Sequence, residues 1–166
     1  MRAKQVSDSY YDVAQICQNG HVVNSMTKFN PVRSSPFCEK CGSPTTTSCA
    51  QCHTPIRGYY SIPGVISSKG YSEPPTFCYK CGNSFPWTEL KIQAAIEMFA
   101  EEVTDAAERK AFQDNLNALS KDTPQAEVAA VRIRKQIAKL GKSAGKSIVK
   151  MVVDVASEMI KKSFTG

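Results

Sequence analysis

The pattern of apolar and polar residues changes near residue 87. Beyond that point apolar residues recur every three or four positions, which is the period of an amphipathic helix. We therefore expect an α-helical domain of three to four helices over 88–166. The apolar stripes that predict it are Ile92, Ile96, Phe99 and Val103; Phe112, Leu116 and Leu119; Ala130, Ile133, Ile137 and Leu140; and Ile148, Val152, Val155 and Met159.

Local signals place the ends of these helices. Thr88 is a plausible N-cap for the first helix, and Thr123 followed by Pro124 is typical of a helix start. The segment "GKSAG" at 141–145 predicts a break before a last helix that runs to about residue 163.

The last predicted helix has more apolar residues than one stripe requires. Lys150, Asp154 and Glu158 form its polar stripe. The excess predicts burial against a second chain or a membrane surface, and we expect this helix to self-associate or to dock on a protein partner. The additional apolar residues are Val149, Met151, Val153, Ala156 and Ile160.

The first half has no such period and is rich in cysteine instead. All seven cysteines lie before residue 82. Six of them form Cys-x2-Cys pairs, and "CQNGH" adds Cys17 and His21, so eight side chains have the spacing of metal ligands. No secretory signal opens the sequence, so we expect a cytoplasmic protein in which these thiols bind two zinc ions. The pairs are Cys38 with Cys41, Cys49 with Cys52, and Cys78 with Cys81.

An internal repeat indicates how the pairs are grouped. Phe-Cys-x-Lys-Cys-Gly occurs at 37–42 and again at 77–82, which makes these two pairs equivalent closing turns of two zinc ribbons. Sequential ribbons follow, with Cys17, His21, Cys38 and Cys41 on one ion and Cys49, Cys52, Cys78 and Cys81 on the other.

The spacing of the cysteines also allows other groupings. Interleaved pairing would give the cross-brace of RING-type domains, and nested pairing would join the four cysteines of 38–52 on one ion. His53 stands four residues after Cys49 and could replace Cys52, although we favour Cys52 because its spacing is complete.

These features predict an α+β protein with a double zinc-ribbon domain over 1–87 and an α-helical domain over 88–166. The ribbons have few apolar residues, so metal must supply much of their folding free energy. Ligand sets that are complete and mostly thiolate are typical of structural sites. No catalytic residues can be assembled, and we expect no enzyme.

Charge is distributed unevenly along the helical half. The chain has a net charge of +6. Residues 88–127 carry nine acidic and four basic side chains, whereas 128–166 carry two acidic and nine basic ones. The basic region is a candidate contact for nucleic acid or another anionic partner, or else helices of opposite charge pack together. No membrane span is expected, because charged residues interrupt the most apolar segment. The candidate contacts are Arg132, Arg134, Lys135, Lys139, Lys142 and Lys146.

A long segment between the third and fourth cysteine pairs interleaves aromatic and basic residues. Such side chains can stack on the bases of single-stranded nucleic acid, or the tyrosines can cover a thin core. The residues concerned are Arg57, Tyr59, Tyr60, Lys69 and Tyr71.

The first 90 positions resemble a bacterial family of uncharacterised proteins with an N-terminal double zinc ribbon, a domain of unknown function. The resemblance rests on "YDVAQICQNGHVVN", "FCEKCG", "CAQCHTPIRGYY", "PGVI" and "FCYKCGNSFPWTE". It implies a cytoplasmic bacterial protein with the seven cysteines as metal ligands, and it implies no particular activity.

Together these observations favour a non-enzymatic zinc-binding scaffold or adaptor with a helical tail for self-association or docking. The alternatives are a RING-like accessory of a protein-modification pathway and a nucleic-acid-binding protein that uses the basic region 132–150.

Overall fold

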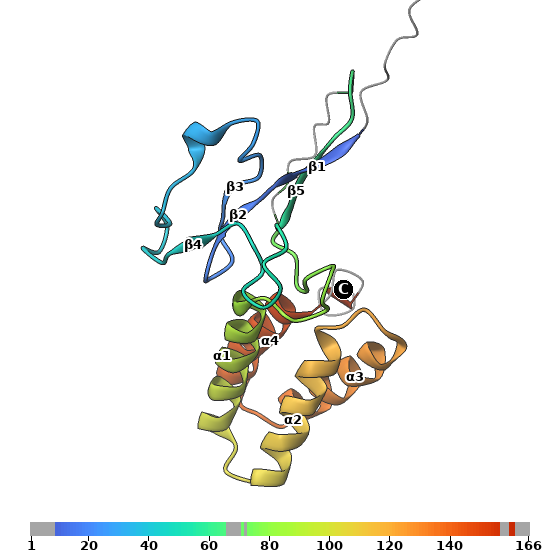
Figure 1. Cartoon of the computed structure of the whole chain (residues 1–166). Helices are drawn as coiled ribbons and strands as arrows, with labels where there is room; N and C mark the ends of the chain where they lie inside the picture. Colours follow the sequence, from blue (N-terminus) through green and yellow to red (C-terminus); the bar gives the residue numbers. More distant parts are fainter. Residues whose placement is uncertain (1–8, 66–70, 72, 157–159, 162–166) are drawn as a thin grey trace, which may run out of the picture. The chain divides into compact units, whose positions relative to one another are not determined.

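The computed structural model describes residues 9–65, 71, 73–156 and 160–161. The chain divides into two compact units, Met1–Trp87 and Thr88–Gly166. In the described residues the first unit consists of short strands and turns, and the second consists of helices (Figure 1). The expected α+β class is confirmed.

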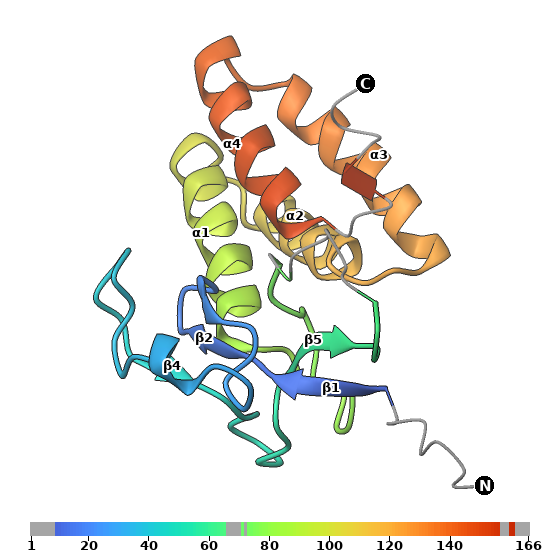
Figure 2. The same cartoon turned by 90° about the horizontal axis from the view of Figure 1, so that it is seen from above.

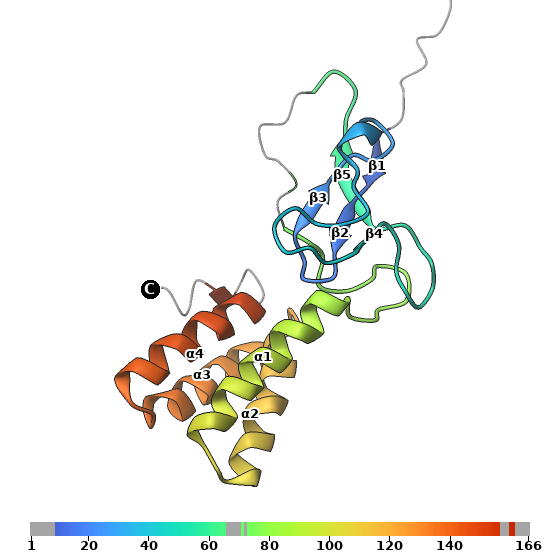
Figure 3. The same ribbon diagram turned by 90° about the vertical axis from the view of Figure 1, so that its left-hand side faces the viewer.

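Short antiparallel strands form two small sheets in the first unit. In one sheet β1 pairs with β5, with Tyr11 opposite Tyr60. In the other, β2 lies between β3 and β4 (Figure 3). The strands are β1 (Tyr10–Val13), β2 (Gln15–Cys17), β3 (Val22–Asn24), β4 (Thr45–Thr46) and β5 (Arg57–Ser61), and Pro31–Arg33 forms a 3-10 turn, η1.

The core of the first unit is small and includes metal-ligand candidates. The rings of Phe85 and Trp87 stack with centroids 4.6 Å apart, and the Trp87 indole donates a hydrogen bond to the Pro75 carbonyl at 2.8 Å. So few apolar side chains bury little surface, and the unit needs stabilisation from elsewhere. The buried members of this core are Ala14, Ile16, Cys49, Ile56, Cys78, Phe85 and Trp87.

Buried polar side chains supplement this core by tying distant loops together. The Asp12 carboxylate accepts hydrogen bonds from the backbone amides of Lys28 at 3.0 Å and Phe29 at 3.1 Å. The Gln15 side-chain amide donates to the Ser35 carbonyl at 2.9 Å and accepts from the Ser35 amide at 3.1 Å. These satisfied polar groups fix the 25–35 loop on the two sheets.

Four helices lie together in the described part of the second unit (Figure 2). Their apolar side chains form one core. The rings of Phe99 and Phe112 stack at its centre, with centroids 3.9 Å apart. The predicted apolar stripes are confirmed for the described residues, because their members are buried in this core or packed against it. The helices are α1 (Pro86–Glu102), α2 (Ala106–Leu119), α3 (Pro124–Ala138) and α4 (Lys142–Val155).

The start of α1 corrects one prediction. The helix begins at Pro86, so Thr88 lies inside its first turn and is not the N-cap. Proline is compatible with that position because its fixed φ suits a helix and its missing N–H has no helical acceptor there. The Thr123 prediction is confirmed, since Thr123 occupies the N-cap of α3 with Pro124 following.

The predicted break at "GKSAG" is wrong for most of its length. Only Gly141 precedes α4, which begins at Lys142. Gly145 is buried, and a Cβ there would lie 3.4 Å from the Ile137 side chain. Close packing of α4 on α3 therefore outweighs the low helix propensity of glycine.

The end of α4 also differs from the prediction. Ala156 has an extended backbone, so the helix stops at Val155 and does not continue unbroken to residue 163. Ala156 and Ile160 are buried in the helical core, and Val149 and Met151 pack against it. The excess of apolar residues is therefore largely accounted for inside the unit. Glu158 and Met159 lie outside the described residues.

Helices in the described part of the chain lack the length and apolar character that a membrane crossing requires.

Candidate metal centres

Three of the four predicted metal-binding turns share one backbone geometry. In each, the amide of the first cysteine donates to the carbonyl five residues later: Cys38 to Ser43 at 2.9 Å, Cys49 to Thr54 at 2.9 Å, and Cys78 to Asn83 at 2.8 Å. The amide four residues after this cysteine donates a hydrogen bond back to the cysteine carbonyl. A short antiparallel bridge closes each turn, at Phe37 with Pro44, Ser48 with Pro55, and Phe77 with Ser84.

The residue after the second cysteine of each turn adopts a left-handed backbone. Gly42 and Gly82 have φ values of 70° and 73°. In the third turn this place belongs to His53, with a φ of 56°. His53 therefore stands where the other turns have glycine, and the third turn contributes Cys49 and Cys52 to its cluster. This outcome agrees with the preference for Cys52 over His53.

The first turn is one residue shorter than the other three. The Cys17 amide donates to the His21 carbonyl at 3.0 Å, and the Gly20 amide donates to the Cys17 carbonyl at 2.9 Å. Gly20 supplies the left-handed residue, with a φ of 86°, so His21 follows it. The second ligand of this turn therefore follows the left-handed residue, whereas in the other three turns it precedes that residue.

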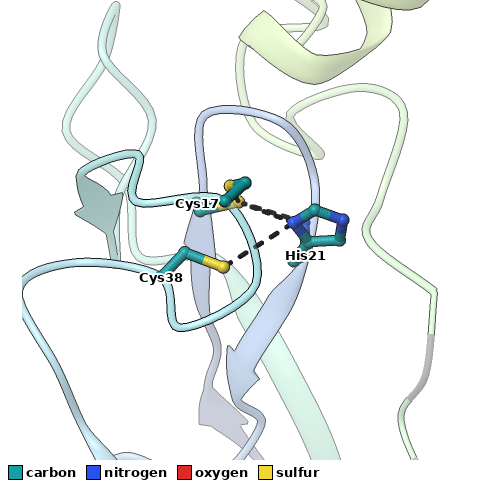
Figure 4. Close-up of side chains that lie close together, drawn as sticks. Cys17, His21 and Cys38 are labelled. Carbon is teal, nitrogen blue, oxygen red and sulfur yellow. Dashed lines mark hydrogen bonds between the residues drawn. The ribbon is translucent and has the colours of Figure 1, made fainter.

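The first cluster brings together one imidazole and three thiols. His21 Nδ1 lies 3.5 Å from Cys17 Sγ and 3.6 Å from Cys38 Sγ (Figure 4). Cys17 Sγ lies 3.7 Å from Cys41 Sγ, and all four ligand atoms lie within 4.8 Å of one another. A tetrahedral ion with metal–sulfur bonds of about 2.3 Å requires sulfur–sulfur edges of about 3.8 Å and sulfur–nitrogen edges of about 3.5 Å. The donor atoms fit such an ion.

The second cluster consists of four thiols. Cys49 Sγ lies 3.8 Å from Cys81 Sγ, and Cys52 Sγ lies 3.6 Å from Cys78 Sγ. All four sulfurs lie within 4.8 Å of one another. These edges also match a tetrahedral ion with four thiolate ligands.

The two groups follow the chain in sequence, as the internal repeat predicts. Cys41 and Cys52 fall in different clusters, which is inconsistent with nested pairing. Interleaved pairing, the cross-brace of RING-type domains, would place Cys17 beside Cys49 and is equally inconsistent with the observed grouping.

Hydrogen bonds to sulfur prepare the first cluster for metal. The His21 amide donates to Cys17 Sγ at 3.2 Å, and the Asn19 side chain donates to Cys41 Sγ at 3.4 Å. The Ser43 backbone amide, aided by Asn19, lowers the pKa of Cys41 to about 5, because these donors stabilise the thiolate. Burial raises the pKa of Cys17. These hydrogen bonds therefore favour the thiolate form of Cys41, which is the form that binds metal.

In the second cluster, too, one thiol has a lowered pKa and another has a raised pKa. The hydroxyl of Thr54 lies 3.2 Å from Cys52 Sγ, and this hydroxyl and the Thr54 amide lower the pKa of Cys52 to about 6. The Asn83 backbone amide favours the Cys81 thiolate, but loss of hydration and repulsion from Cys52 and Cys78 outweigh it and raise the pKa of Cys81 to about 11. Thiols this close compete for ionisation until a cation balances their charge.

The six basic candidates of the helical unit all lie on its surface, along α3 and α4. Lys139 forms an ion pair with Glu108 of α2 at 2.6 Å. The Gln136 side-chain amide also donates a hydrogen bond to the Glu108 backbone carbonyl at 3.3 Å. At least one of the six basic side chains is thus paired with an acidic residue of α2 within the same unit.

The aromatic and basic segment is partly incorporated in a sheet. Arg57, Tyr59 and Tyr60 lie in β5, and Lys69 lies outside the described residues. Tyr71 is half-buried, and its hydroxyl has no hydrogen-bond partner in the described part of the chain. Burial raises the pKa of Tyr71 to about 12.

Sequence reasoning missed several residues that contact the clusters. Asn19, Thr54 and Asn83 interact with cluster sulfurs. Their positions inside or just after a cysteine turn were the available signal, because such residues have backbone and side-chain donors within reach of sulfur.

Two four-donor clusters on paired turns and short strands define a class of small proteins with two candidate metal sites in a ribbon-like unit, here followed by a helical unit. The chain belongs to the family described as an uncharacterized protein conserved in bacteria (DUF2321), whose match covers residues 10–164. The family therefore extends through the helices and well beyond the first 90 residues in which the sequence resemblance was noted. No curated protein and no solved structure matches the chain.

Proposed function

We propose that this protein is a non-enzymatic scaffold whose first unit is held together by two structural zinc ions. The observation that carries the proposal is the completeness of both donor sets. Each cluster supplies four protein ligands whose spacing matches the edges of a tetrahedron. Structural zinc sites have this closed coordination, whereas catalytic zinc sites keep a position for water or substrate.

The donor chemistry favours zinc. Three thiolates with one imidazole, and four thiolates, are soft ligand sets in tetrahedral arrangement, which suit zinc better than magnesium or calcium. Free thiols of this density persist in a reducing compartment, which supports a cytoplasmic location. The small core of the first unit supports a stabilising role for the metal.

The helical unit is the proposed docking part of the scaffold. The apolar side chains of α4 are mostly used inside the unit, but Val128 and Val131 of α3 are exposed by 51% and 50%. They lie three residues apart and so share one helix face. We therefore assign association with a protein partner or a second copy to α3 in place of α4.

Native mass spectrometry of the purified full chain tests the zinc proposal. We expect two zinc ions per chain, and one zinc after either Cys17→Ser or Cys52→Ser, because each substitution removes a ligand from a different cluster. His53→Ala is the matched control and should retain both ions. A chain that purifies folded with no zinc, or that keeps two ions in both cysteine variants, would contradict the proposal.

Nucleic-acid binding through the helical unit is the second candidate. Arg132, Lys135 and Lys139 occupy one stripe of α3, and Lys142, Lys146 and Lys150 occupy one stripe of α4, all exposed. Such stripes neutralise phosphates without reading sequence, so binding of arbitrary DNA should weaken steeply as salt rises. A change in affinity of less than twofold between 50 and 200 mM salt would exclude this candidate.

A further inference from the structure

The first unit carries a row of exposed aromatic and cationic side chains that contact one another in turn. The ring centroids of Tyr60 and Tyr11 lie 4.6 Å apart, and the ring planes are tilted by 42°. The Arg57 guanidinium lies 4.7 Å from the centroid of Tyr11 and 3.8 Å from that of Tyr79. We refer to Tyr60, Tyr11, Arg57 and Tyr79 as the aromatic stack.

Three separate segments assemble the aromatic stack. Tyr11 comes from β1, Arg57 and Tyr60 come from β5, and Tyr79 lies between Cys78 and Cys81 in a turn of the second cluster. Antiparallel pairing sets Tyr11 opposite Tyr60. The rings are therefore positioned by a sheet and a metal-binding turn.

The stack is on the surface and is not part of the core. Tyr11, Tyr60 and Tyr79 are exposed by 47%, 45% and 54%, and none of them belongs to the apolar core of the unit. Exposed aromatic rings held next to one another present apolar faces and edges to solvent without burying them. Such an arrangement is suited to a flat, apolar ligand.

The charged residues around the aromatic stack indicate which kind of flat ligand it would bind. The aromatic stack contains the cation Arg57, and Lys80 stands exposed next to Tyr79. Among residues 10–13, 57–61 and 78–83, the one acidic side chain is that of Asp12, which is buried and bonded to the amides of Lys28 and Phe29. The face is therefore apolar and positive, with no acidic side chain of these segments on it.

We propose that the aromatic stack binds single-stranded nucleic acid, with bases against the tyrosine rings and backbone phosphate beside Arg57 and Lys80. Every base offers a π face, so such binding tolerates any sequence. A guanidinium that is stacked on rings keeps N–H donors at its edge, which suits phosphate oxygens. A duplex hides its base faces and should bind poorly. This site rests on the proposed function, because Tyr79 lies between two ligands of the second cluster and metal binding there would hold it in place.

Salt dependence separates this site from the basic stripes of the helical unit. Two cations limit the number of phosphates neutralised at the aromatic stack, so most of the affinity comes from stacking and the salt dependence is shallow. Binding through α3 and α4 would engage more cations and would weaken more steeply.

The test is fluorescence anisotropy of a labelled twelve-residue oligo-dT titrated with the zinc-loaded full chain. Stacking of a base on an aromatic ring contributes enough that Tyr60→Ala and Tyr79→Ala should each weaken binding about tenfold. Tyr10→Ala is the matched control, since Tyr10 is 47% exposed on the same strand but outside the stack. It should leave the affinity within about twofold, by the same stacking argument.

Zinc counted on each variant distinguishes failure of this site from failure of the proposed function. The inference is overturned if the chain with two zinc ions does not bind the oligonucleotide. It is also overturned if the tyrosine variants bind normally while Arg132→Glu abolishes binding. Capture of a proline-rich peptide in place of the oligonucleotide, lost in the same tyrosine variants, would assign the surface to protein recognition and overturn it as well.

Discussion

The left-handed turn at Gly20 rests directly on Trp87. A Cβ added at Gly20 would lie 3.0 Å from Trp87 Cβ and 3.2 Å from its Cγ, and Gly20 has a φ of 86°. The metal-binding turn that carries Cys17 and His21 therefore packs on the buried indole of the same unit. The chain's single tryptophan accordingly reports on the integrity of this unit.

Gly20→Ala should destabilise the first unit by about 3 kcal/mol, combining about 1 kcal/mol for a left-handed alanine with the cost of overpacking. Gly42→Ala is the control, because Gly42 has a φ of 70° but nothing within 4 Å of an added Cβ. It should lose only the backbone part, about 1 kcal/mol. Urea unfolding followed by tryptophan emission measures both. Equal losses in the two variants would show that the contact with Trp87 contributes nothing.

Gly58→Ala should prevent the first unit from folding. A Cβ there would overlap the Ser25 carbonyl oxygen and lie 2.8 Å from the Ala14 amide nitrogen. These are backbone atoms, and the Ser25 carbonyl accepts a hydrogen bond from the Tyr59 amide at 2.9 Å. We expect loss of dispersed amide signals from this unit by NMR. Gly141→Ala, with open space and an ordinary φ, should leave the spectrum unchanged apart from its neighbours.

His53→Gly should retain two metal ions and raise the stability of the first unit by up to about 1 kcal/mol. The left-handed φ of 56° costs histidine energy that glycine does not incur, and the greater entropy of unfolded glycine offsets part of the gain. Metal content and urea unfolding measure the two effects. Loss of one ion would identify His53 as a ligand and refute the role given to Cys52.

The grouping of the candidate ligands into two clusters could be predicted from the sequence, because it depends on local spacing and on a repeat. The same spacing did not reveal that His53 occupies a glycine position, since a complete Cys-x2-Cys pair carries no information about the next φ. Nor could it place Gly20 against Trp87, which are far apart in the chain. Such contacts depend on how distant turns meet, and no periodic pattern encodes them.

The helices were predicted where burial follows a regular period. Phe112, Leu116 and Leu119 are all buried as their spacing indicates. The errors occurred where tertiary packing overrides propensity, as at Gly145, which lies inside α4 against Ile137. The aromatic stack could not be predicted in full from the sequence. Tyr11 and Tyr79 lie outside the segment in which aromatic and basic residues alternate.

Phe112→Ala should destabilise the helical unit by about 4 kcal/mol, because it removes a fully buried ring that stacks on Phe99 at 3.9 Å. Thermal unfolding followed by circular dichroism at 222 nm measures the loss. Val128→Ala is the control: its side chain is 51% exposed, so the change should be below about 0.5 kcal/mol. A loss in Phe112→Ala no larger than in Val128→Ala would contradict the assigned core.

Removal of metal should unfold the first unit and spare the second. The first unit buries few apolar side chains, and two clusters of close thiols repel one another once they ionise without a cation. The second unit has its own apolar core and contains no cysteine. A strong chelator should therefore shift the emission of Trp87 to the red, while most of the helical signal at 222 nm persists. Zinc should reverse the shift, and magnesium, which binds thiolates poorly, should not. Simultaneous loss of both signals would show that the helices depend on the metal-bound unit and would refute independent folding.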